Sequence, residues 1–216
     1  IVGVFPYHEI APNKQFVFVT KEGMIKRTAM NEFDVWRTYK SRPTLCIKLK
    51  TETDEIISAE LVEGSANLDV LLITHLAFGL YYDLEEVPVV GARASGVKSI
   101  NLKNDDYVVS GMILNRGEDA TLTIVTQRGS VKRMKVNELS KLGRAKRGLM
   151  VLRELKSNPH RVFAAIKNRE KQIISVQTET NKVYGIDYKE LPINDRQSNG
   201  SFVIDEKQDI GVTEVT

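Results

Sequence analysis

The sequence lacks several features that would indicate an enzyme, a metal protein or a secreted protein. Its 216 residues include a single cysteine, Cys46, so no disulfide can form within the chain and a reducing compartment is favoured. The three histidines are far from one another and from Cys46, without the spacing of metal ligands. Neither GxxxxGKS/T nor GxGxxG, the phosphate-binding patterns of nucleotide sites, occurs. We therefore expect no catalytic residue, no metal site and no cofactor site in this chain.

Long apolar runs are also missing. The most apolar window, residues 70–82, is interrupted by Thr74 and His75 and is shorter than the roughly 20 residues that span a bilayer. Residues 1–15 lack the basic start and long apolar run of a signal peptide. A hydrophobic content of 42% is enough for a core, and a charged content of 27% is ordinary for a globular domain. We expect a soluble cytoplasmic domain with no membrane partner.

The sequence contains a long repeat. Four threonines that lead into turns lie 54, 52 and 52 residues apart: Thr20, Thr74, Thr126 and Thr178. Three glycines repeat downstream at a spacing of 52: Gly96, Gly148 and Gly200. A fixed long period indicates repeated structural units. The predicted repeats are 16–68, 69–120, 121–172 and 173–216, with 1–15 as a strand and loop that end a preceding blade.

Each repeat begins with a pattern typical of a β-hairpin. Apolar residues alternate with period two, a turn of about four residues follows, and a second strand comes after it. A third strand is expected around the aligned residues Ile47, Ile100, Leu152 and Ile204, with a fourth strand after it. Four short strands per period are typical of a propeller blade, and blades must stack to bury both faces. A short helical turn is expected at Val136, Leu139 and Leu142. The predicted fold class is all-β and propeller-like, with repeats of about 52 residues.

Charge is concentrated in one repeat. The net charge of the chain is +3, but residues 121–172 contain 14 Lys and Arg and only three Asp and Glu. Repeats 69–120 and 173–216 each carry four more acidic than basic residues. A basic surface of this size favours attraction of a polyanion over a merely solvated face.

The hairpins and one loop supply the candidate contacts. Lys26-Arg27 and Lys132-Arg133 occupy equivalent positions, where the second repeat has Leu80-Tyr81. Consecutive strand residues point to opposite faces, so one residue of each pair is expected to face a ligand. The glycine-flanked loop 143–148 adds further cations that can approach a phosphate closely. The candidate phosphate-contacting residues are Lys26, Arg27, Arg128, Lys132, Arg133, Lys135, Arg144, Lys146, Arg147 and Arg153.

These motifs resemble those of a known family. The pattern T-x-x-G-x-I/V-K-R occurs as TKEGMIKR from Thr20 and TQRGSVKR from Thr126, at a spacing near 50 and followed by a glycine-bearing basic loop. In this combination the chain resembles the C-terminal domain of type IIA bacterial topoisomerase A subunits over essentially its whole length. The resemblance implies a β-pinwheel, a closed, open or broken ring whose blades are interlocked by exchanged strands. It also implies a basic outer rim that binds and bends duplex DNA without sequence preference.

The resemblance favours the topoisomerase IV branch over gyrase. The gyrase box Gln-Arg-Arg-Gly-Gly-Lys-Gly has its nearest counterpart in GRAKRGL, residues 143–149, which lacks the Gly-Gly-Lys-Gly core. The implied partners are duplex DNA, the ATPase B subunit, and the remainder of the topoisomerase IV polypeptide to which such a domain belongs. ATP and Mg²⁺ would act elsewhere in the full, nucleoid-associated enzyme, and its catalytic tyrosine lies in a domain outside this sequence.

Two alternatives to the topoisomerase IV interpretation stay open. A gyrase-type wrapping domain is compatible if its box lies upstream of Ile1. A propeller-like module that binds an acidic protein would use the same basic surface. A gel shift with an unrelated duplex in low salt separates the DNA-binding interpretations from the protein-binding one.

Overall fold

The structure, a computed structural model, describes residues 1–6, 13–33, 44–64, 67–103, 105–205, 209 and 211–216. Its regular structure in these segments is β, apart from three short 3-10 turns: η1 (Met30–Phe33), η2 (Leu84–Glu86) and η3 (Val136–Glu138). The prediction of an all-β fold is confirmed. The helical turn expected at Val136 is η3.

The first two sheets are antiparallel and four-stranded, with the strand orders β3-β1-β2-β6 and β10-β5-β4-β7. The strands of the first are β1 (Lys14–Thr20), β2 (Met24–Ala29), β3 (Ile56–Glu63) and β6 (Val97–Lys98). Those of the second are β4 (Leu68–Thr74), β5 (Phe78–Asp83), β7 (Val108–Asn115) and β10 (Leu149–Met150).

The third sheet has the order β11-β8-β9-β14, and the fourth has the order β13-β12-β15. The strands of the third are β8 (Thr121–Thr126), β9 (Ser130–Lys135), β11 (Val162–Lys167) and β14 (Ser201–Phe202). Those of the fourth are β12 (Ile173–Thr178), β13 (Val183–Asp187) and β15 (Val212–Val215).

One edge strand of each four-stranded sheet is donated by the following stretch of chain. β6 pairs with β2, β10 with β5 and β14 with β9, so each sheet is completed by a strand of two residues from further along the sequence. The prediction of a third strand within its own blade was therefore wrong. The donated strands end two residues before Ile100, Leu152 and Ile204, because the chain leaves the ladder there and buries these side chains. Ile47 is buried but belongs to no strand.

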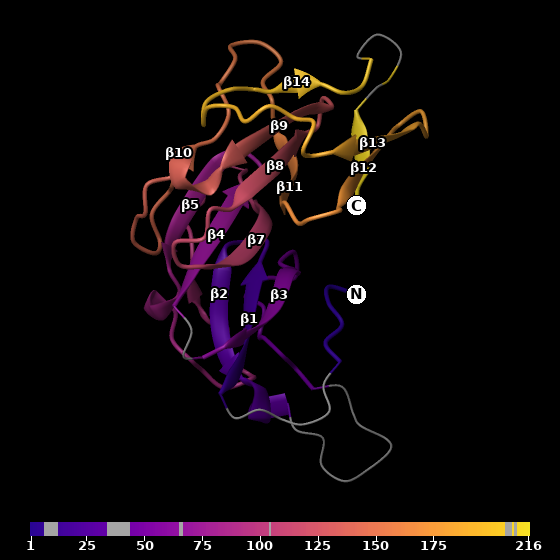
Figure 1. The fold of residues 1–216 in the computed structure, drawn as a ribbon. Helices are drawn as coiled ribbons and strands as arrows, with labels where there is room; N and C mark the ends of the chain where they lie inside the picture. The colour runs from indigo at the N-terminus through magenta and orange to yellow at the C-terminus, as the bar shows by residue number, and fades with distance from the viewer. Residues whose placement is uncertain (7–12, 34–43, 65–66, 104, 206–208, 210) are drawn as a thin grey trace.

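The four sheets follow one another along an arc (Figure 1). The edge strands β3, β7 and β11 lie side by side and form its inner side. Both chain ends lie at the right of the view, whereas β10 lies at the left, on the outer side of the arc. The donated strands and the loops that lead into them therefore form the outer edge.

Apolar residues are buried on both faces of the hairpins because each sheet is packed between its neighbours. The first core, between sheets one and two, includes Val17, Val19, Val70 and Leu72. The second, between sheets two and three, includes Leu71, Ile73, Leu122 and Ile124. The third, between sheets three and four, includes Val125, Val131, Ile174 and Val176. Alternate residues of one strand thus serve two different cores, as period-two alternation requires.

The repeated threonines stabilise the hairpin turns. Each of the first three is buried, and its hydroxyl oxygen accepts a hydrogen bond of 3.1 Å from the backbone N–H four residues later. In all four turns the residue three positions after the threonine has a positive φ: Gly23, Ala77, Gly129 and Asn181. In the first three turns the side chain therefore caps a four-residue turn whose last position is left-handed.

The repeated glycines have a steric cause. Gly148 has a φ of 90°, and a Cβ atom there would lie 2.4 Å from the carbonyl oxygen of Gly79 on β5. Gly96 and Gly200 make the same close approach to β2 and β9. Only glycine lets the donated strand reach its partner at this distance.

Residues 1–6 form no strand, contrary to the strand expected at the start of the chain, although the ring of Phe5 packs edge-on against Phe16 with 5.3 Å between ring centroids. Among the described residues, no helix has the length and apolar character needed to cross a membrane.

Candidate nucleic-acid interface

Lys26 lies in the interior, not at the surface. It is fully buried on β2, opposite Phe18 in the ladder. Its ammonium group donates to the backbone carbonyl oxygens of Gly91, Ala92 and Ala94 at 3.0, 2.7 and 3.3 Å. Burial lowers the pKa of Lys26 below its usual value, although Cys46 and Glu32 oppose the effect. All three donors are used inside the protein, so the phosphate contact predicted for Lys26 is wrong.

Lys132 has the same environment on β9. Its side chain is 1% exposed, and its ammonium group donates to the carbonyl oxygens of Val151, Asp195, Arg196 and Ser198 at 2.6 to 3.1 Å. Burial, assisted by repulsion from Arg196, lowers the pKa of Lys132 to about 8. The predicted phosphate contact is wrong here as well, because reaching a duplex would mean leaving four acceptors unsatisfied in the interior.

The two paired arginines are half-buried and also contact backbone carbonyls. The Arg27 Nε donates to the Val87 oxygen at 2.6 Å, and burial lowers the pKa of this guanidinium. The Arg133 Nη1 donates to the Tyr188 oxygen at 3.4 Å, and its guanidinium lies 5.1 Å from the Tyr188 ring centroid. Each arginine thus contacts the next stretch of chain and keeps part of its side chain in solvent.

The basic loop 143–148 lies at the outer edge of the second sheet, just before β10. Arg144 is tied down: its Nε and Nη1 donate to the carbonyl oxygens of Glu86 and Lys98 at 3.1 and 2.5 Å. The Arg147 guanidinium stacks 4.2 Å from the Phe78 ring centroid. Lys146 is exposed, and its neighbour Ala145 adopts a left-handed φ of 62°.

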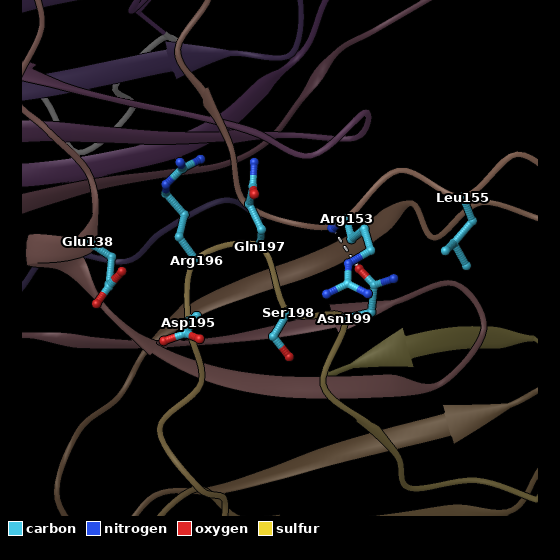
Figure 2. Close-up of a pocket in the computed structure, with 8 residues that line it drawn as sticks. All are labelled: Glu138, Arg153, Leu155, Asp195, Arg196, Gln197, Ser198 and Asn199. Atoms are coloured by element: carbon cyan, nitrogen blue, oxygen red, sulfur yellow. Dashed lines mark hydrogen bonds between the residues drawn. The ribbon is translucent and has the colours of Figure 1, made fainter.

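Arg153 lines a surface hollow of about 680 Å³, toward the end at which Leu155 lies (Figure 2). The hollow is lined by Glu138, Arg153, Leu155, Asp195, Arg196, Gln197, Ser198 and Asn199. The Arg153 backbone N–H donates to Asn199 Oδ1 at 2.7 Å. The bond does not involve the guanidinium, and Arg153 is exposed. Figure 2 shows Glu138 and Asp195 toward the opposite end of the hollow from Arg153.

The last two predicted residues are engaged within the protein. The Arg128 guanidinium donates to the Asn158 oxygen at 2.8 Å and lies 5.3 Å from the Phe202 ring centroid. The Lys135 Nζ lies 3.4 Å from the Asp119 carboxylate, a solvent-exposed ion pair of small energy.

The structure therefore divides the ten predicted residues into three groups. Lys26 and Lys132 are buried, and Lys146 and Arg153 are exposed. In the described part of the chain neither of the exposed pair forms an ion pair. The half-buried group comprises Arg27, Arg128, Arg133, Lys135, Arg144 and Arg147.

Sequence reasoning missed Arg196. This half-buried residue lines the same hollow as Arg153 and donates through Nη1 to the Met150 oxygen. It was overlooked because repeat 173–216 is acidic overall. Its position in RQSNGSF, the counterpart of the basic loop 52 residues earlier, was the available signal. The described residues contain no group of three or more His, Cys, Asp or Glu side chains able to hold a metal ion.

Comparison with known proteins agrees with this architecture. The family described as "DNA gyrase C-terminal domain, beta-propeller" matches residues 14–63, 68–115 and 120–168. The DNA topoisomerase 4 A subunit of Bacillus subtilis (strain 168) is 44% identical over 215 residues, which are 100% of this chain and 26% of that protein. The Streptococcus pneumoniae (serotype 4) protein of the same name is 41% identical over 202 residues, 87% of this chain and 24% of its own. The chain thus spans about a quarter of the length of these relatives.

Solved structures show the same fold. A crystal structure of the C-terminal domain of DNA topoisomerase IV matches 100% of this chain and 65% of its own, with a TM-score of 0.90 and 39% identity. The DNA gyrase A C-terminal domain matches 96% of this chain and 66% of its own, with a TM-score of 0.73 and 21% identity, a likeness of fold alone. The resemblance predicted from the hairpin motifs and the β-pinwheel fold are both confirmed. Because the family match covers most of the chain, the protein belongs to the DNA gyrase C-terminal domain family.

Proposed function

We propose that this chain is a non-catalytic domain of a topoisomerase IV A subunit that binds duplex DNA and bends it along its basic outer edge. It would hold one duplex segment for the catalytic core, which with ATP, Mg²⁺ and the B subunit lies elsewhere in the enzyme. The family, and the similarity of the whole chain to part of the topoisomerase 4 A subunits, support the DNA-binding role.

The location of the interface is proposed from the distribution of positive charge. The surplus of positive charge falls in residues 121–172, and the exposed Lys146 and Arg153 flank β10 on the outer side of the arc. Arg147 lies beside them over Phe78. Cations on a convex edge neutralise phosphates and do not enter a groove, so binding is expected to be independent of sequence.

The experiment measures duplex affinity as a function of salt. Replacing Lys146 and Arg153 together by Ala should weaken binding and flatten the plot of log K against log salt by about 0.9 for each phosphate that is no longer neutralised. Both side chains are exposed, so the substitutions should leave the fold intact.

Arg93 and Lys98 provide the matched control. Both are exposed, and they lie at the corresponding loop and donated strand one repeat earlier, in an acidic region. Their double replacement should change affinity and slope much less. Equal effects from the two pairs would contradict the proposed location, and no binding to an unrelated duplex in low salt would favour the module for an acidic protein.

The choice between topoisomerase IV and gyrase behaviour rests on the loop 143–149, which lacks the Gly-Gly-Lys-Gly core of the gyrase box. Bending without a full wrap is the behaviour proposed for this chain.

A further inference from the structure

The Lys-Arg pairs of the first and third hairpins contact the same part of the next repeat. Lys26 and Arg27 donate to carbonyls within residues 87–94, which lead into the donated strand β6. Lys132 and Arg133 donate to carbonyls within residues 188–198, which lead into β14. The motif that identifies the family therefore bridges two neighbouring blades.

The backbone repeats this arrangement at both places. Arg27 and Val89 form an isolated parallel bridge, and so do Arg133 and Ile193. The Val90 N–H donates to the Arg27 oxygen at 2.9 Å, and the Asn194 N–H donates to the Arg133 oxygen at 2.8 Å. The lysine side chain thus closes a segment whose main chain is already docked on the same strand.

An ammonium group suits this position for a chemical reason. A loop that turns three carbonyl oxygens inward needs donors without acceptors, and a lysine supplies three on a flexible stem. Removing it would leave buried carbonyl groups unsatisfied, at a cost larger than the bonds themselves contribute.

The connection between the second and third blades is built differently. Leu80 replaces the lysine on β5 and is fully buried in the apolar core. The carbonyl of Lys146, equivalent to those of Ala94 and Ser198, instead accepts the Asn101 N–H at 2.9 Å. We call the junction at which a donated strand joins the preceding blade a seam. Among the described residues, two seams contain a lysine and the one between the second and third blades contains Leu80 instead.

We infer that Lys26 and Lys132 are positioning residues that lock the exchanged strands β6 and β14 onto the preceding blades. For Lys132 the locked loop also carries Arg196 and one wall of the hollow beside Arg153. Its effect on DNA contacts rests on the proposed function, whereas the lock itself does not.

Hydrogen exchange of the 216-residue chain without DNA tests the lock. One backbone bond recurs at each seam: Ser99 N–H to Gly23, Val151 N–H to Ala77 and Val203 N–H to Gly129, at 2.7 to 3.0 Å. Lys132→Met keeps the apolar stem and removes the donors. Exchange at Asn194 and Val203 should then accelerate at least tenfold, and exchange at Val90 and Ser99 should keep its rate.

The reciprocal variant is the matched control. Lys26→Met should accelerate exchange at Val90 and Ser99 and leave Asn194 and Val203 unchanged. Leu142, whose N–H donates to the Tyr81 oxygen at 2.8 Å at the seam with Leu80, should respond to neither substitution. A uniform acceleration across the three seams, or none, would overturn the inference.

Amine labelling of the unmodified protein covers the case in which the variants do not fold. In the free protein, Lys26 and Lys132 should react with an acylating reagent at least tenfold more slowly than the exposed Lys98 and Lys146. Equal reactivity of Lys132 and Lys146 in the free protein would refute a buried lock. Should the domain fail to bind DNA at all, both the exchange and the labelling results would still stand.

Discussion

At the scale of single residues, the pKa of a buried lysine depends on the carbonyl oxygens and charged groups that surround its ammonium group. Lys132 lies among four carbonyl oxygens, with Arg196, Asp195 and Glu138 as the charged groups that influence it. Its pKa of about 8, against the ordinary value of 10.5, couples proton release to folding.

The sign of that coupling gives a prediction for Lys132→Met. Below pH 8 folded and unfolded chains both keep the proton, and between pH 8 and 10.5 the folded chain has released it while the unfolded chain has not. The free energy of unfolding of the unmodified protein should therefore rise with pH relative to the variant, by up to roughly 3 kcal/mol. Urea titrations of both proteins at pH 7.5 and 10 measure this. A difference that is constant or falls with pH would contradict it.

Gly148 provides a second prediction at this scale. Gly148→Ala combines a φ of 90° with a Cβ 2.4 Å from a backbone oxygen, so we expect a loss of at least about 3 kcal/mol in the free energy of unfolding. Gly117→Ala is the control, since Gly117 has a φ of 78° with nothing within 4 Å and should cost only about 1–2 kcal/mol. Equal losses in urea denaturation would show that the close approach to β5 is unimportant.

At the scale of strands and seams, the apolar alternation predicts the hairpins, whereas the exchange of strands was implied by the family resemblance alone. The period-two alternation beginning at Phe16, Val70, Leu122 and Ile174 coincides with β1, β4, β8 and β12. The donated strands have two residues each, too few for any alternation to be visible. Their place in the preceding sheet depends on backbone pairing over more than 65 residues of chain.

The buried lysines were missed for a related reason. A lysine on a strand is ordinarily solvated, and the carbonyls that bury Lys26 come from 65 to 68 residues away. The equivalent position in the second repeat is Leu80, a core residue. A leucine at the equivalent position of the second repeat was the indication in the sequence that this position faces inward.

A charged cluster at the second seam gives a prediction for this scale. Asp69 is 1% exposed and accepts hydrogen bonds of 2.6 Å from both Tyr81 Oη and Lys141 Nζ. Although burial raises the pKa of Asp69, the bonds from Lys141 and Tyr81 outweigh it and hold this pKa below its usual value. Asp69→Asn should lower the free energy of unfolding by about 2 kcal/mol, less than a fully buried pair because Lys141 is partly solvated.

Asp119→Asn is the control for that substitution. Asp119 is exposed and pairs with Lys135 at 3.4 Å, so its loss should cost less than about 0.5 kcal/mol. Denaturation at neutral pH distinguishes the two, and indistinguishable midpoints would mean that the Asp69 cluster does not stabilise the seam.

At the scale of the whole molecule, the arc offers a discontinuous positive track. Residues 121–172 are strongly basic and the repeats on either side are acidic. Bending a duplex of 20–30 base pairs costs on the order of 1–6 kcal/mol, which a run of phosphate contacts over a short arc can offset. The acidic neighbours should repel the duplex beyond it.

We therefore expect a bend without a chiral wrap. Relaxing a closed circular plasmid with a nicking-closing enzyme in the presence of saturating protein should change the linking number little. Energy transfer between the ends of a short duplex should still report a bend. A large positive change in linking number would instead indicate gyrase-like wrapping.

The donated strands also set the order of events on the ribosome. The first sheet begins at Lys14 but receives its last strand from Val97–Lys98, after β3 has ended at Glu63. At 5–20 residues per second, a nascent first blade waits roughly 2–7 s with the edge of β2 unpaired. The same delay recurs for β5 and β9, because each awaits its strand from a repeat still to be translated. Each of the first three blades therefore passes through synthesis as an open sheet, and pauses in translation at these points would prolong its exposure to other chains.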